Sequence, residues 1–69
     1  MTSEQIKIIL SGISEQLKLI EEDTTFREIG DSEKCNTDMG AAVNDAVFAV
    51  DEMIEGVLSF EGSGTQNAI

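Results

Sequence analysis

The sequence predicts an all-α protein, an antiparallel helical hairpin with a short helical turn in its connection. Apolar residues recur at alternating spacings of three and four in two separate segments. Each segment spans about 20 residues, or ~30 Å of helix, so the two helices have matched lengths. A polar stretch that is long for a helix-to-helix link separates them, which indicates local structure in the connection.

The first segment predicts a helix over about residues 3–22. Thr2 and Gln5 have the spacing of a capping box, in which each side chain accepts a backbone N–H at the helix start. Ile8 and Leu19 form a second apolar line on another face, which one partner helix would not cover. The main apolar stripe consists of Ile6, Leu10, Ile13, Leu17 and Ile20, widened by Ile9.

The second segment predicts a helix over about residues 38–60, and its periodicity is the strongest in the chain. Val47 and Ile54 line one flank of its apolar stripe. Small residues on the other flank, which let another helix backbone approach closely, recur at heptad spacing: Ala42, Ala49 and Gly56. The stripe itself consists of Met39, Val43, Ala46, Val50, Met53, Val57 and Phe60.

The connection, about residues 23–37, also carries helix signals. Thr25 and Glu28 repeat the capping-box spacing, and Gly30 can supply the left-handed residue that ends a helical turn. We therefore expect a short helical turn that covers the end of the hairpin with Phe26.

One domain over residues 1–61 and a flexible tail over 62–69 complete the predicted organisation. A chain of 69 residues builds only a small core, so an isolated hairpin is marginally stable. Two hairpins packed as a four-helix bundle would cover more of the apolar surface, which favours a homodimer.

The charge balance excludes several function classes. Fourteen acidic residues against four basic residues give a net charge of −10, and the basic residues stand singly. Direct binding of nucleic acid needs clustered Lys and Arg, and is therefore disfavoured. No His is present, which argues against an enzyme that uses acid–base catalysis near neutral pH. No apolar run reaches the length of a membrane span or a signal peptide, and we expect a cytoplasmic protein.

Cofactor and metal chemistry is also not expected. Cys35 is the single cysteine, so it cannot form an internal disulfide, and without a His it lacks the usual base of a cysteine nucleophile. A calcium loop that started at Asp31 would have Asn36 where Gly is required and Ala42 where Glu is required. We therefore expect an inert thiol and no metal site.

The second helix concentrates the negative charge around one aromatic residue. It carries six carboxylates and no base, and Phe48 stands off the apolar stripe. This pattern predicts a protein-binding face, in which Phe48 anchors the contact and the acids steer toward Lys and Arg. Alternatively, Phe48 packs under the connection or in a dimer contact, and the acids are only solvated. The predicted partner-binding residues are Asp45, Phe48, Asp51, Glu52 and Glu55.

The run from Asp23 to Ser32 resembles the loop and attachment site of acyl or peptidyl carrier proteins. The resemblance implies phosphopantetheine on Ser32. It covers about ten residues and then departs from the family, because Glu33 replaces an apolar residue, the next helix starts late, and the third and fourth helices of the family are absent.

In size, acidity and layout, the whole chain resembles small phage-encoded host-takeover proteins, including DNA mimics and anti-activators. This resemblance implies a bacterial host cytoplasm, and no family residue can be carried over. Together with the acidic helix, it predicts an inhibitor that occludes a basic surface of a partner protein, such as a transcription regulator or an ATPase. The alternatives are a structural helical-bundle subunit and a carrier protein.

Overall fold

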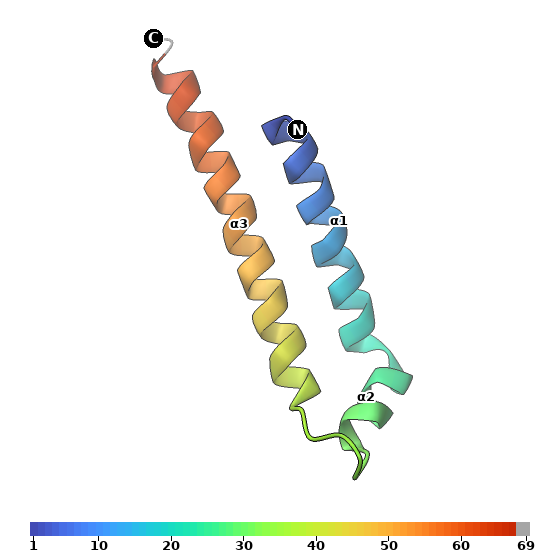
Figure 1. The fold of residues 1–69 in the computed structure, drawn as a ribbon. Coiled ribbons are helices and arrows are strands. Elements are labelled where there is room, and N and C mark those ends of the chain that lie inside the picture. Colours follow the sequence, from blue (N-terminus) through green and yellow to red (C-terminus); the bar gives the residue numbers. More distant parts are fainter. Residues whose placement is uncertain (68–69) are drawn as a thin grey trace.

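The computed structural model describes residues 1–67 and contains three helices in this range. The helices are α1 (Ser3–Glu22), α2 (Thr24–Asp31) and α3 (Met39–Asn67). Figure 1 shows α1 and α3 antiparallel, with α2 in the connection at one end of the hairpin and with the start of α1 and the end of α3 toward the other end. The predicted all-α hairpin with a short helix in its connection is confirmed.

The start of α1 has the predicted capping box. The Gln5 backbone N–H donates to Thr2 Oγ1 over 3.1 Å, and the Thr2 N–H donates to Gln5 Oε1 over 2.9 Å. Two backbone donors that have no partner within the helix are thereby satisfied. The predicted bounds of the first helix, 3–22, are those of α1.

The start of α2 differs from the prediction. Its N-cap is Asp23, whose carboxylate accepts the Phe26 N–H over 3.2 Å, so the predicted capping box of Thr25 and Glu28 is wrong. Asp is a better N-cap than Thr, and Asp23 stands at the first position after α1 where the chain can turn. Gly30 is also not the expected left-handed terminator, because no glycine in the described part of the chain has a positive φ.

The far end of α3 also differs from the prediction. The helix begins where Asp38 Oδ1 accepts the Ala41 N–H over 3.1 Å, close to the expected start. It then continues through Asn67, past the expected end at 60 and into the segment predicted as a flexible tail. A glycine in a helix costs only about 1 kcal/mol, and no proline interrupts this segment. The last two residues of the predicted tail, 68–69, lie outside the described residues.

The hairpin is a single layer of helices with a small interior. Its dimensions are 58 × 18 × 15 Å, and the short dimensions are little more than the diameter of one helix with its side chains. Among the side chains that the structure describes, the buried apolar ones are Val43 and Val50. The apolar stripe of each helix is therefore only partly covered by the other helix. No helix in the described range is long and apolar enough to cross a membrane.

Candidate functional site

The outer face of α3 points away from α1 and carries the predicted anchor. Phe48 is 64% exposed and lies on this face with Asp45, Glu52 and Glu55, which are also exposed. No Lys or Arg follows Lys34 in the sequence, so α3 has no base to neutralise these carboxylates. An exposed aromatic ring among unpaired carboxylates is a surface that can bind a cationic protein.

Asp51, the fifth predicted partner-binding residue, points in another direction. Its Oδ1 accepts a hydrogen bond from the Ser14 hydroxyl over 3.0 Å, across the contact between α1 and α3. Ser14 is 5% exposed and is the buried polar residue of the described side chains. The structure therefore places four of the five predicted residues together on the outer face, whereas Asp51, which is itself exposed, is hydrogen-bonded to α1 at the edge of the contact between the helices.

A second polar contact joins the helices near the termini. Lys7 Nζ lies 2.8 Å from Glu61 Oε1 and 3.0 Å from Glu4 Oε2, and the Ser3 hydroxyl donates to Glu61 Oε2 over 2.8 Å. Hydrogen bonds from Lys7 and then from Ser3 lower the pKa of Glu61 below its ordinary value of 4.5. The hydrogen bonds to Glu61 and then to Glu4 raise the pKa of Lys7 above 10.5. Glu61 thus fixes α3 against the first turn of α1.

These contacts correct one sequence-based expectation and add residues that it missed. The absence of a base in the second helix predicts acids without an ion-pair or hydrogen-bond partner, but Glu61 binds Lys7, Asp51 binds Ser14 and Asp38 caps α3. The polar positions of α1 that face α3 are not among the predicted residues, because apolar periodicity does not indicate buried polar side chains. They are Ser3, Lys7 and Ser14, with spacings of four and seven residues that keep them on one side of α1.

The residues of the two predicted apolar stripes divide between the interior and the surface of the hairpin. Val43 and Val50 are buried, and half-buried positions are Leu10, Leu17, Met39, Ala46 and Val57. The remaining members are exposed: Ile6, Ile13, Ile20, Met53 and Phe60. Ile8 and Leu19, the predicted second line, are 64% and 68% exposed. The two helices of one chain therefore cover only part of their apolar stripes.

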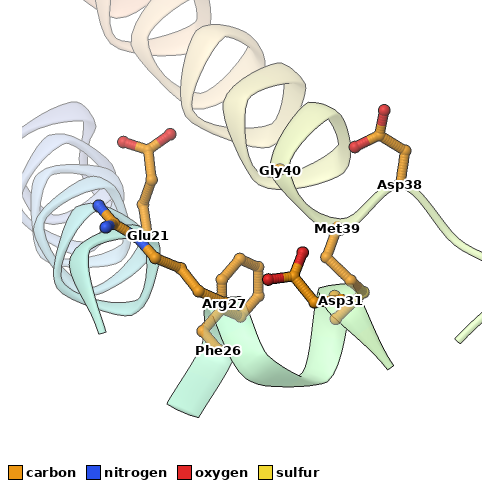
Figure 2. A pocket seen from close by; sticks show the side chains of 8 residues that line it. Glu21, Phe26, Arg27, Asp31, Asp38, Met39 and Gly40 are labelled. Carbon is orange, nitrogen blue, oxygen red and sulfur yellow. The ribbon is translucent and has the colours of Figure 1, made fainter. Parts of the chain in front are cut away.

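A hollow lies between α2 and the start of α3. It has a volume of about 560 Å³, and Figure 2 shows the side chains that line it. Phe26 lies in this hollow at the end of the hairpin, as predicted, and Met39 packs against the backbone of Gly30. Acidic side chains of Glu21, Asp31 and Asp38 stand around its edge. No group of His, Cys, Asp or Glu side chains in the described range is arranged to hold a metal ion.

The two residues with reactive groups in the connection are held by local contacts. The Ser32 hydroxyl accepts the Lys34 N–H over 3.2 Å, and Ser32 caps the end of α2. The next helix starts at Met39, several residues after Ser32. The Cys35 thiol donates to the Thr37 carbonyl over 3.3 Å and is half-buried.

Comparison with models of protein families, with curated proteins and with solved structures finds no match for this chain.

Proposed function

We propose that this chain is a small protein-binding inhibitor that occludes a basic functional surface of a partner protein. The observation that carries the proposal is the exposed Phe48 ring, which lies among carboxylates on the outer face of α3. A bacterial transcription regulator or ATPase is the kind of partner that fits, because DNA-binding and nucleotide-binding regions are basic.

The parts of the outer face have separate roles in this proposal. Asp45, Glu52 and Glu55 supply long-range attraction, which raises the rate of encounter with a positive surface. Phe48 supplies short-range affinity by entering an apolar pocket of the partner. Inhibition follows from competition, because the bound inhibitor covers the surface that the partner uses for its own ligand.

A homodimer belongs to the same proposal. Two copies form a four-helix bundle, which adds the second layer of structure that a stable domain requires. The outer face of α3 stays free in such a bundle, since a second layer stacks on the flat side of the hairpin. Each dimer therefore presents two acidic faces.

The test is capture of the partner from a bacterial lysate by the immobilised protein, followed by an activity assay of the captured protein. We expect a protein with a basic surface that elutes at high salt and loses activity when the inhibitor is added. Phe48→Ala and Glu52→Lys should each weaken the inhibition, and Glu15→Lys, a charge change equal to that of Glu52→Lys but placed on α1, should retain it. Full inhibition by both outer-face variants would overturn the proposal.

A structural subunit of a larger assembly is the second candidate, and the exposed apolar side chains favour it. Under this alternative the immobilised protein captures further copies of itself or coat-like subunits, and the captured material is unchanged in the Glu52→Lys variant.

A further inference from the structure

One flat side of the hairpin is free of charge. In α1, the side chains one position before the contacts with α3 are apolar: Ile6 precedes Lys7 and Ile13 precedes Ser14. In α3, Met53 precedes half-buried Ile54 and Phe60 precedes Glu61.

Two antiparallel helices that lie side by side are related by a two-fold rotation about the normal to their common plane. Residues that precede a contact residue by one position therefore lie on the same side of the hairpin in both helices. The opposite side confirms this geometry. A groove there brings together residues that follow the contacts, namely Ile8 and Glu15 of α1 with Leu58 of α3. The residues that precede the contacts consequently share the other side. We call it the apolar face, and it consists of Ile6, Ile9, Ile13, Ile20, Ala42, Ala46, Ala49, Met53, Gly56 and Phe60.

The exposed surface area of the hairpin indicates that a partner of similar size covers this face. The chain exposes 5363 Å². A compact monomer of 7.4 kDa exposes about 4,200 Å², so the hairpin has about 1,200 Å² in excess. A standard protein interface covers about 800 Å² on each partner. A second copy of the same length covers the face from end to end and supplies the missing layer.

We propose that two copies join through their apolar faces, with α1 of each copy lying along α3 of the other. This inference rests on the dimer in the proposed function and is independent of the acidic outer face. The two-fold axis runs parallel to the long axis of the hairpins, so both α2 helices lie at the same end of the dimer and all neighbouring helices are antiparallel.

Side-chain size favours this pairing of α1 with α3. Ile6, Ile13 and Ile20 form a bulky row at heptad spacing on α1. Small residues at the same spacing form a shallow row on α3: Ala42, Ala49 and Gly56. The Ser14–Asp51 hydrogen bond fixes the axial register between α1 and α3 within one copy. Because the two-fold axis is parallel to the helices, the same register holds between the copies, and Ile13 of one copy lies beside Ala49 and Met53 of the other. The opposite arrangement, with α1 on α1 and α3 on α3, would stack the bulky rows on each other and leave voids between the small ones.

Charge favours the same pairing. The segment from Asp38 to Glu61 has six carboxylates and no base, whereas α1 has two lysines against four glutamates and is therefore the less negative helix. In the proposed dimer the two α3 helices lie diagonally across the bundle, and each has two α1 helices as neighbours. Direct contact of α3 with α3 would bring like charges together.

The test uses the single cysteine of the wild-type chain. A nitroxide attached to Cys35 reports the distance between the two connections by pulsed electron paramagnetic resonance, and light scattering reports the mass. We expect a dimer at micromolar concentration, with the two labels separated by a distance comparable to the short dimensions of the hairpin, 18 and 15 Å. A monomer overturns the dimer, and a label separation near the long dimension of 58 Å overturns the arrangement.

A pair of variants tests the face itself. Ile13→Glu adds a charge to the apolar face and should raise the dimer dissociation constant at least 100-fold. Ile8→Glu adds the same charge to the opposite side and should leave the dissociation constant unchanged. Equal weakening by both variants would contradict the proposal, and the label distance remains decisive if Ile13→Glu fails to fold. Because Phe48 and Glu52 lie outside this face, failure here leaves the partner-binding test intact.

Discussion

The Ser14 hydroxyl donates a hydrogen bond to Asp51 Oδ1 over 3.0 Å and joins the middle of α1 to the middle of α3. Ser14 is 5% exposed, so its hydroxyl has little access to water and this bond takes the place of its hydration. This contact fixes the axial register between the two helices. It also fixes which sides of the helices face each other and which stay exposed to solvent.

Replacement of Ser14 by Ala should therefore destabilise the hairpin. The loss of one hydrogen bond at a buried position costs about 1 kcal/mol, and the smaller side chain introduces no clash. Urea unfolding followed by circular dichroism measures the change in the free energy of unfolding. Ser11→Ala, at an exposed position of the same helix, is the control and should change it little; equal effects of both variants would show that the bond contributes nothing.

Glu61 gives the stability a defined pH dependence. Its folded-state pKa lies below 4.5, so its contribution is complete above that pH and is lost as the pH falls through the lowered value. Glu61→Gln should lower the midpoint of thermal unfolding at neutral pH, and the difference from wild type should shrink as the solution is acidified below pH 4.5. Glu15→Gln, which removes the same charge, should show a smaller difference at neutral pH. A Glu61→Gln difference that does not change with pH would exclude this role.

Gly12 is a site where the chain can be stabilised. It lies inside α1, and an added Cβ would meet no atom within 4 Å. Gly12→Ala should raise the free energy of unfolding by about 1 kcal/mol, because alanine loses less backbone entropy in a helix. Urea unfolding tests this value, and a destabilised variant would mean that another chain lies against this surface.

Phe48→Ala should weaken partner binding without unfolding the protein. The ring is 64% exposed and contributes little to the interior, whereas truncation of an interface anchor costs about 2 kcal/mol, or roughly 30-fold in affinity. We expect the loss as faster dissociation in surface plasmon resonance, with an unchanged circular dichroism spectrum. Leu19→Ala, at an equally exposed apolar position of α1, should dissociate at the wild-type rate.

The sequence predicts the helices better than it predicts their contacting faces. Apolar periodicity identifies α1, most of α3 and their antiparallel pairing, because these depend on local spacing and on chain length. It does not reveal that Ser14 is buried while Ile13 is exposed, since two helices can cover only part of a wide apolar stripe. Ser3, Lys7 and Ser14 do share one side of the helix by their spacings of four and seven, but polar residues are ordinarily assigned to the solvent side.

The candidate site shows the same limit. The acidic outer face and Phe48 follow from their angular distance from the apolar stripe, so they could be predicted from spacing alone. The partners of Asp51 and Glu61 depend on the register between α1 and α3, which no local pattern specifies. The extension of α3 to Asn67 also escaped prediction, because two glycines weaken a helix without ending it.

The salt dependence of association with the captured partner tests the proposed acidic face most directly. The association rate constant of the wild-type protein should fall steeply as the salt concentration rises, and Glu52→Lys should associate more slowly with a flatter dependence. Glu15→Lys carries the same change of net charge and should stay close to wild type. Identical rates and salt dependences for the wild-type protein and Glu52→Lys would contradict the assignment of the outer face of α3 as the binding surface.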